Sequence, residues 1–175
     1  MATTATATRN EFAELLQAAQ RTAAHLEMRD VYAVGDPSFE AWQAGQPFDR
    51  SGRDAVWRGI LAGPIGRGVQ VRRARIVSEP VTDYIRYEHE ITAAANLAAG
   101  EQVRWLPRRQ ASDLALPGND FWLFDERTLR FNHFTGDGRW AGTEIVTDSA
   151  VVRLCASAFD AVWSRAVPHG IYRPA

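Results

Sequence analysis

The stretch that decides the fold runs from residue 69 to residue 106 and begins with the segment Val69-Gln-Val-Arg-Arg-Ala-Arg-Ile-Val77. Its apolar side chains alternate and then run together, which is typical of a largely buried strand. Residues 80–99 follow as a helix, and Gly100 supplies the left-handed residue that commonly ends one. A second strand is expected over residues 102–106. Strand, long helix and strand in this order favour an α/β fold with a mixed sheet flanked by helices.

The sequence on either side of this unit predicts further helices and a meander of strands. Thr8 with Glu11 forms a capping box, while Asp36 and Asp148 are expected to be N-cap residues. The remaining helices are expected over residues 8–26, 37–45 and 53–62 and from residue 149 onward. The remaining strands are expected over residues 121–124, 129–134 and 139–146, with Asp137-Gly138 as a hairpin turn.

Length and composition predict a single intracellular domain. No repeat or low-complexity linker divides the 175 residues, so we expect a flexible tail over residues 1–9 and one α/β domain over residues 10–175. The first eight residues lack the basic and apolar regions of a secretion signal, and no apolar run is long enough to span a bilayer. The lone cysteine, Cys155, agrees with a reducing compartment. We therefore expect a cytoplasmic protein that does not enter a membrane.

The residue inventory excludes several chemistries. The sequence contains no lysine, which removes a Walker-type phosphate loop, a Schiff base and a lysine general base. A net charge of −1 argues against a general polyanion binder, so we do not expect direct nucleic-acid binding. The four histidines show no pair at metal-ligand spacing, and we expect neither a metal nor another cofactor. No nucleophile motif is visible, so no catalytic residue is assigned.

Two arginines occupy positions where the predicted strand should be apolar. Arg73 and Arg75 share a strand face with Val71 and Val77, and Glu88 falls on the apolar stripe of the following helix. A buried arginine prefers a carboxylate partner, so these charges form either an internal ion pair or the wall of a ligand cleft. The residues predicted to hold a small polar or zwitterionic ligand are Arg75, Glu79, Tyr84, Tyr87, Glu88 and Arg104.

A second group of candidate site residues combines arginine with tryptophan. It lies on the strand expected over residues 102–106 and in the segments that follow it. Surfaces of this kind stack nucleobases or bind protein partners, and the alternative is a core strand with a solvated basic end. The residues predicted to contact a protein partner are Trp105, Arg108 and Trp122. Those that would contact nucleic acid are Arg72, Arg104, Arg108 and Arg109.

Five segments carry a resemblance to a known family. They are His25-Leu-Glu-Met-Arg-Asp-Val-Tyr32, Val77-Ser-Glu-Pro80, Asp83-Tyr-Ile-Arg-Tyr-Glu88, Gly100-Glu-Gln-Val-Arg-Trp-Leu-Pro-Arg108 and Asp120-Phe-Trp-Leu-Phe-Asp125. Together they resemble a family of high-GC Gram-positive bacteria described only as a domain of unknown function, over the range from Phe12 to Tyr172. Members are commonly encoded beside helix-turn-helix regulators, which implies a regulatory role.

A more distant resemblance links residues 57–168 to one half of a phospholipase D-like domain. That superfamily carries the signature HxKxxxxD, in which histidine is the nucleophile or acid and lysine holds the phosphate. With Asp125 at the last position, Gly118 stands at the histidine position and Asp120 at the lysine position. An aspartate there repels a phosphodiester, so the resemblance implies a degenerate relative that kept the cleft and lost the reaction.

These observations favour a non-catalytic regulatory or binding module that acts with a helix-turn-helix regulator or senses a small polar ligand. One alternative is an enzyme with a rebuilt acid-base site, in which Glu88, Asp120 or His133 acts near Arg75 and Arg104. The other alternative is nucleic-acid binding through the arginine and tryptophan group. The sequence leaves a homodimer open.

Overall fold

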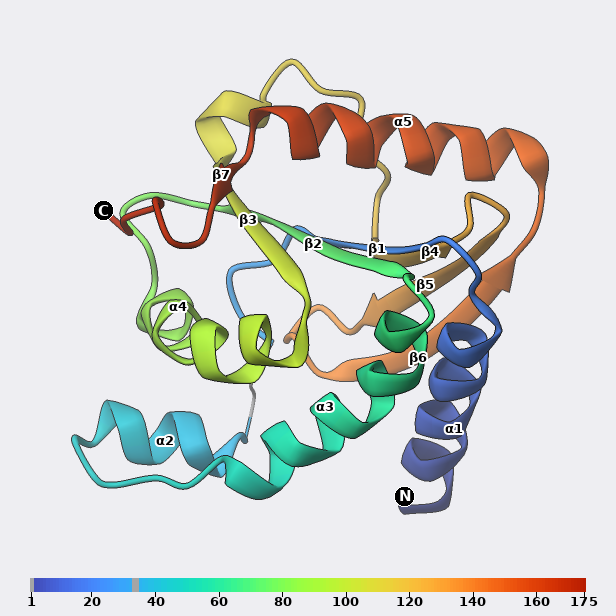
Figure 1. The fold of residues 1–175 in the computed structure, drawn as a ribbon. Coiled ribbons are helices and arrows are strands. Elements are labelled where there is room, and N and C mark those ends of the chain that lie inside the picture. Colours follow the sequence, from blue (N-terminus) through green and yellow to red (C-terminus); the bar gives the residue numbers. More distant parts are fainter. Residues whose placement is uncertain (1, 33–34) are drawn as a thin grey trace.

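The computed structural model describes residues 2–32 and 35–175, which contain a seven-stranded mixed sheet with helices on both faces (Figure 1). The strands are β1 (Thr22–Glu27), β2 (Gln70–Val77), β3 (Gln102–Pro107), β4 (Asp120–Phe124), β5 (Thr128–Phe134), β6 (Trp140–Val146) and β7 (Val167–Pro168). Their order in the sheet is β6-β5-β4-β1-β2-β3-β7. Strands β1, β2 and β3 are parallel, and the other neighbours pair antiparallel.

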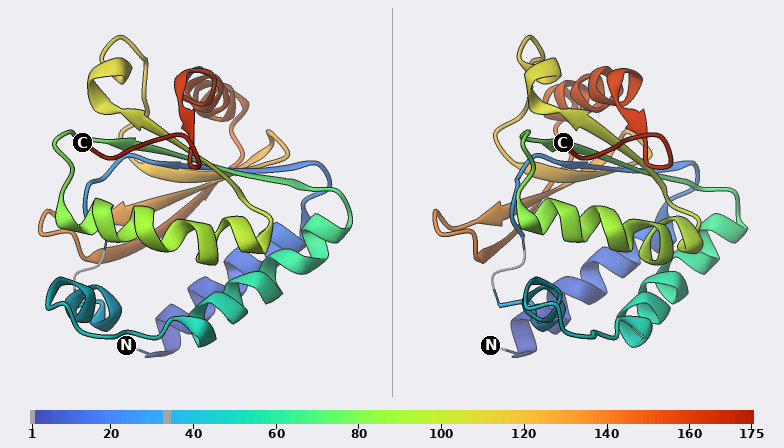
Figure 2. Two further views of the ribbon diagram at one scale, coloured as in Figure 1. Left: turned by 60° about the vertical axis from the view of Figure 1, so that its left-hand side comes forward. Right: turned by 90° about the vertical axis from the view of Figure 1, so that its left-hand side faces the viewer.

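The helices cover both faces of the sheet. They are α1 (Ala2–Ala18), α2 (Pro37–Gln43), α3 (Ser51–Gly66), α4 (Asp83–Ala95) and α5 (Ser149–Arg165), with short 3-10 helices η1 (Leu97–Ala99) and η2 (Arg108–Ala111). Helix α5 packs on one face, whereas α1, α3 and α4 pack on the other, and α2 lies outside α4 (Figure 2). The predicted α/β fold with a mixed sheet flanked by helices is confirmed. None of the described helices has the length and apolar character that crossing a bilayer requires.

The stretch chosen as decisive folds as predicted. It forms β2, α4, η1 and β3, and Gly100 has a φ of +89°. A Cβ at Gly100 would lie 2.7 Å from Ile65 Cδ1, so close packing as well as backbone conformation requires glycine. The N-caps at Asp36 and Asp148 are also confirmed, because Asp36 accepts from Ser38 N and Asp148 accepts from Ala150 N and Val151 N. The capping box predicted at Thr8 and Glu11 is wrong, because both residues lie inside α1.

The largest error of the sequence reading lies at the N-terminus. A single helix was expected over residues 8–26, but α1 runs from Ala2 to Ala18 and the central strand β1 begins at Thr22. Alanine, leucine and histidine at residues 23–26 suit a helix locally. In the fold, however, β2 and β4 bind this segment on both sides, and tertiary pairing outweighs the local preference.

Helix α3 also continues past its predicted end at residue 62, although Pro64 lies inside it. Proline has no N–H, so the carbonyl of Ile60 loses its helical donor. Gln17 Nε2 of helix α1 donates to that carbonyl at 3.1 Å. A long-range side-chain contact therefore satisfies the group that a local rule treats as a helix stop.

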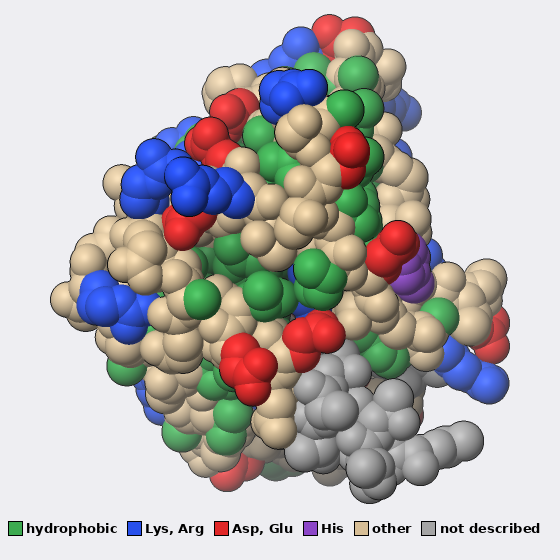
Figure 3. Space-filling view, turned by 90° about the vertical axis from the view of Figure 1, so that its right-hand side faces the viewer, with side chains coloured by type: hydrophobic (Ala, Val, Ile, Leu, Met, Phe, Trp, Pro, Cys, Tyr) green, Lys and Arg blue, Asp and Glu red, His purple; other side chains and the backbone are tan. Residues whose placement is uncertain are grey.

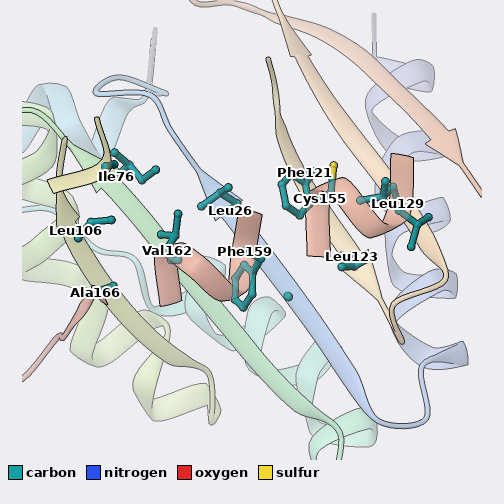
Figure 4. Close-up of a cluster of buried hydrophobic side chains, with 14 residues drawn as sticks. Leu26, Ile76, Leu106, Phe121, Leu123, Leu129, Cys155, Phe159, Val162 and Ala166 are labelled. Atoms are coloured by element: carbon teal, nitrogen blue, oxygen red, sulfur yellow. The ribbon is translucent and has the colours of Figure 1, made fainter. Parts of the chain in front are cut away.

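The two faces of the sheet differ in chemistry. The face under α5 is apolar, and Leu26, Ile76 and Phe121 of the central strands form one buried cluster with Phe159 and Val162 of α5 (Figure 4). The opposite face carries the alternate residues of the same strands, and many of these are charged or polar. Those that are buried there are His25, Glu27, Arg73, Arg75 and Asp120. This buried polar face places the candidate site.

Candidate functional site

Glu27 is the centre of a buried ion-pair network on this face of the sheet. Its carboxylate accepts from Arg73 Nη1 and, at 2.5 Å, from Arg75 Nε. Strand pairing explains the arrangement, because β1 lies beside β2 in parallel register with Glu27 opposite Arg75. The side chains of Glu27 and Arg75 are only 9% and 5% exposed, so these charges depend on one another instead of on water.

Glu101 is the second carboxylate of the network. Its Oε1 accepts from Arg73 Nε at 2.7 Å, and its Oε2 accepts from Trp57 Nε1 at 3.2 Å and Asn96 Nδ2 at 2.6 Å. The side chain has no exposed surface, so both oxygens take their hydrogen bonds from protein donors instead of from water. The turn that follows Gly100 places this carboxylate against β2.

Glu88 of α4 is the third carboxylate and the least well satisfied. Its Oε1 accepts from Tyr84 OH at 3.0 Å and lies 3.5 Å from Arg75 Nη2. Its Oε2 lies 3.3 Å from Arg75 Nε but is buried without a hydrogen-bond donor among the described residues. Arg75 Nη1 instead donates to Thr92 Oγ1, one turn along the helix, at 2.7 Å. The predicted pairing of Arg75 with Glu88 is present, but Glu27 is the stronger partner.

The three-carboxylate network borders a cavity of about 210 Å³. The cavity is lined by Arg50, Arg53, Asp54, Trp57, Arg73, Arg75, Glu88, Ile91, Ala95 and Asn96. Its walls therefore come from α3, β2 and α4 and include four guanidinium groups, two carboxyl groups and an indole. Arg75 and Glu88 therefore form an ion pair and also line the cavity, so the two alternatives predicted for them are both present.

Residues of α3 and the segment before it line the cavity together with the network. Arg50 Nη1 donates to Tyr87 OH at 2.9 Å, and its Nη2 lies 3.4 Å from Asp54 Oδ1. Arg53 Nη1 forms an ion pair with Asp36 at 2.7 Å. Arg50 Nε and Asp54 Oδ1 are nevertheless buried without a hydrogen-bond partner among the described residues. Both a donor and an acceptor of the cavity wall thus lack hydrogen-bond partners.

The pKa values of the carboxyl groups on this face are shifted in opposite directions. The Arg73 and Arg75 guanidiniums outweigh burial and lower the pKa of Glu27 far below its ordinary value. Burial raises the pKa of Glu88 by more than Arg75 lowers it, and the nearby Glu27 carboxylate adds to the rise. Burial likewise lowers the pKa of His25, which stacks on Trp122. Glu27 is consequently ionised and His25 neutral, while Glu88 holds a proton more readily than an exposed glutamate does.

Asp120 lies on the same face at the start of β4. It accepts from Met28 N at 2.9 Å and from Tyr32 OH at 2.5 Å. Burial raises the pKa of its carboxyl to about 6; the Tyr32 hydrogen bond opposes this rise and the Glu27 carboxylate adds to it. Within the described residues, no group of three or more histidine, cysteine or acidic side chains is arranged to hold a metal ion.

Asp120 predicts a pH dependence of stability. Its folded pKa is raised above the unfolded value, so the folded state binds the proton more tightly and the stabilisation is fully present below about pH 4. It is lost as the pH rises through about 6. The free energy of unfolding of the wild type should therefore fall across this window relative to that of Asp120→Asn, by about 3 kcal/mol. Urea titrations at several pH values measure the difference, and parallel curves would contradict the assignment.

The structure brings together only part of the predicted ligand site. Arg75 and Glu88 line the cavity, and Tyr84 and Tyr87 hydrogen-bond to residues that line it. Glu79 accepts instead from Tyr172 OH near the C-terminus and does not line the cavity. The remaining predicted residue, Arg104, points to the opposite face.

The assignment of Arg104 to the ligand site is wrong. Its neighbours in β3 face α4, whereas the Arg104 side chain faces α5. Its Nη1 donates to the Trp163 carbonyl at 2.9 Å, and its guanidinium lies 4.4 Å from the Trp163 ring centroid. The side chains of a strand alternate between faces, so Arg104 and Arg75 cannot share one pocket. For the same reason His133, on the face of Leu129, is separated from Glu88 and Asp120.

The tryptophans predicted to contact a protein partner are buried. Trp105 is 0% exposed and Trp122 is 4% exposed, so neither ring is available to a partner on the surface. Trp105 instead lies under Arg75, with 4.8 Å between guanidinium and ring centroid. Arg108 is partly exposed but donates to Ser78 Oγ, Asp30 and two carbonyls. Tryptophan is common both at interfaces and in cores. Here the two rings pack against the buried guanidiniums of Arg75 and Arg73.

Sequence reasoning missed Glu27, Glu101, Asp54 and Trp57. Glu27 could not be found because residues 22–26 were assigned to the end of a helix, which left Glu27 directly after it and outside any strand. A signal for Glu101 was present, since two inward arginines need more than one carboxylate and Glu101 follows directly after the helix-ending Gly100. Asp54 and Trp57 lie at helical spacing on α3, which locally reads as an ordinary amphipathic face.

The three positions matched to the phospholipase D signature have other roles here. Gly118 lies in the loop before β4, and Asp120 holds Tyr32 and the Met28 N–H. Asp125 accepts from the backbone N–H groups of Gln20, Arg21 and Thr22. Its carboxylate thus fixes the connection between α1 and β1.

Solved structures share this fold at low sequence identity. Nuc from Salmonella typhimurium, a phospholipase D family member, matches with 14% identity and a TM-score of 0.50, over 94% of this chain and 90% of Nuc. NucT from Helicobacter pylori matches with 9% identity and a TM-score of 0.51, over 93% of this chain and 91% of NucT. TrmBL2, an archaeal chromatin protein, matches with 15% identity and a TM-score of 0.49 over 91% of this chain. The chain spans 49% of TrmBL2.

These likenesses describe the fold: a mixed seven-stranded α/β sheet similar to that of phospholipase D-family proteins. No curated protein matches the sequence. The model of one family covers nearly the whole chain, from residue 10 to residue 174. The chain therefore belongs to the family described as domain of unknown function DUF6879.

Proposed function

We propose that this chain is a non-catalytic binding domain that holds a small polar molecule in the cavity between α3, β2 and α4. The observation that carries the proposal is that three residues lining the cavity each have a buried polar side-chain atom without a hydrogen-bond partner among the described residues. These atoms are Glu88 Oε2, Asp54 Oδ1 and Arg50 Nε. Buried polar atoms normally have partners, and each one left unpaired costs about 1–3 kcal/mol. A polar ligand that supplies both donors and acceptors removes this cost.

Filling the cavity tests the proposal. Ala95 lines the cavity, whereas Ala94 is exposed on the same helix. Small neutral polyols, carboxylates, amines and amino acids are titrated into labelled protein and followed by amide chemical shifts. We expect a ligand that shifts residues around the cavity, binds Ala94→Leu normally and does not bind Ala95→Leu. The proposal fails if no compound binds or if both variants bind equally.

The absence of catalysis follows from the residues at the signature positions. A phosphodiesterase of this type needs histidine and lysine, and this chain has Gly118 and Asp120 there. A carboxyl group at the second position repels the phosphate that the lysine would hold. We expect no turnover of bis(p-nitrophenyl) phosphate above the rate in buffer. Turnover that disappears in Asp120→Asn or Asp125→Asn while the variant stays folded would establish an enzyme instead.

The rebuilt acid-base alternative keeps one observation in its favour. Glu88 and Asp120 lie on the same face, and burial raises the pKa of both carboxyl groups. Raised carboxyl pKa values suit a general acid near neutral pH. Its other proposed members, His133 and Arg104, lie on the opposite face. Any such chemistry is therefore confined to the two carboxyl groups and Arg75.

The alternative of direct nucleic-acid binding is less well supported, because most of the arginines proposed for it already contact other groups of the fold. Arg72 stacks over Phe159 and Trp163, and Arg104 and Arg108 donate to carbonyls and side chains of the fold. On the face shown in Figure 3, acidic and basic side chains are interspersed. We expect no shift of a 30-base-pair duplex at 150 mM salt. A shift that weakens steeply with salt and is lost in Arg108→Ala/Arg109→Ala would contradict this.

The regulatory role is the part of the proposal that rests on family resemblance. A neighbouring helix-turn-helix regulator is the proposed partner, and the cytoplasm is the proposed compartment. Co-purification of the chain with that regulator, compared with an unrelated regulator as the control, tests the partnership. Sedimentation of the chain alone tests the homodimer.

A further inference from the structure

The charges around the cavity leave room for one more positive group. The residues of the buried network are the carboxylates Glu27, Glu88 and Glu101 and the guanidiniums Arg73 and Arg75. His25 lies 3.4 Å from Glu27 but is neutral because burial lowers its pKa, so three acids face two bases. The other charged groups near the cavity are balanced, since Arg50 pairs with Asp54 and Arg53 pairs with Asp36. Among the described residues, the network is therefore one cation short of neutrality when all its groups are ionised.

Glu88 is the acid that this shortage affects. Glu27 receives hydrogen bonds from both guanidiniums, and Glu101 receives three hydrogen bonds from protein donors. Glu88 Oε2 receives none, and Glu88 is the one of the three acids that lines the cavity. In the empty protein a proton on Glu88 removes the excess charge, which agrees with the raised pKa of its carboxyl.

Building on the proposed binding function, we propose that the ligand is a small zwitterion of the α-amino acid class, with its ammonium group on Glu88 Oε2. An ammonium group supplies both the missing charge and the missing donor. Arg50 Nε, a buried donor without an acceptor among the described residues, receives the ligand's carboxylate. Both ends of the molecule then meet groups of opposite charge on the cavity wall.

The size of the cavity agrees with this class. About 210 Å³ holds about seven water molecules at ~30 Å³ each. Pockets for drug-sized ligands and cofactors are larger, at about 300–1,000 Å³. Nucleotides and dinucleotides are thus too large to be enclosed here, whereas a molecule with the bulk of a small amino acid fits.

A matched series of compounds tests the inference. The standard amino acids are titrated singly by calorimetry, and the best binder is then compared with its analogue without the ammonium group and its analogue without the carboxylate. We expect at least a tenfold weaker Kd for each analogue. Repeating the titration in buffers of different ionisation heat, at several pH values between about 4 and 8, should also show proton release wherever the empty protein holds a proton on Glu88, because ammonium binding forces Glu88 to ionise.

The variant Glu88→Gln keeps the shape of the side chain and removes its charge. We expect it to weaken amino acid binding at least tenfold and to abolish proton release, while Glu14→Gln, an exposed control, changes neither. If neutral polyols or simple carboxylates bind in the cavity and amino acids do not, the zwitterion inference is overturned and the binding function stands. If no compound binds, both are overturned.

Discussion

Replacing Glu27 with glutamine is expected to lower the free energy of unfolding by about 3–5 kcal/mol. The carboxylate bridges Arg73 and Arg75, and the amide that replaces it carries no charge and points a donor at donors. Each guanidinium keeps another carboxylate, but Arg75 keeps only the poorly aligned Glu88. A typical domain is stable by about 5–15 kcal/mol, so the loss removes a large fraction of the total.

Urea denaturation followed by tryptophan fluorescence measures this loss, and Glu14→Gln is the control, expected within about 0.5 kcal/mol of the wild type. A double variant, Glu27→Gln with Arg75→Gln, separates charge burial from packing. Because Glu27 and Arg75 are in direct contact, the losses in the two single variants should not add, and the double variant should lose less stability than their sum. A loss below about 1 kcal/mol in the single variant would show that the network contributes little.

Replacing Asp125 with alanine is expected to destabilise the fold by about 3 kcal/mol and to do so without any effect on ligand affinity. The carboxylate accepts three backbone hydrogen bonds, from Gln20, Arg21 and Thr22, and these position the start of β1. Its φ of +51° adds a cost for alanine, because this conformation disfavours a Cβ without a local polar contact.

Asp125→Gly separates the two contributions, because glycine accepts the conformation but offers no acceptor. We expect most of the loss to persist in the glycine variant. The backbone N–H groups lower the pKa of Asp125 despite its partial burial. Its stabilisation is therefore present above the ordinary carboxyl pKa and is lost as the pH falls below it. Full stability of Asp125→Gly at pH 7 would show that the connection between α1 and β1 does not depend on this carboxylate.

Local patterns predicted much of the architecture. The unit from residue 69 to residue 106 and the turn at Gly100 follow from side-chain periodicity and backbone preference, and both are confirmed. The central strand β1 could not be found this way, because its six residues are stabilised by neighbours some fifty to a hundred positions away. Because β1 was not predicted, Glu27 was not recognised as the acid that pairs with both Arg73 and Arg75.

The candidate site divides in the same way. That Arg73 and Arg75 need carboxylates was evident from strand alternation, and Glu88 was correctly assigned as one of them. Arg104 was grouped with them because it lies on a neighbouring strand, but its register places it on the α5 face. Trp105 and Trp122 were assigned to a partner surface with a core strand as the alternative, and their burial against Arg75 and Arg73 supports the alternative.

The amino-acid sequence by itself determined the strand-helix-strand unit of residues 69–106, the N-caps at Asp36 and Asp148 and the presence of charge on a core face, because these depend on neighbouring residues and on fixed periods. Only the tertiary structure decided which acids meet which arginines, that three carboxylates share two guanidiniums, and that a cavity remains beside them. Such facts depend on the register between strands and on the packing of α3 and α4. Burial then converts that geometry into charge states, which no local pattern specifies.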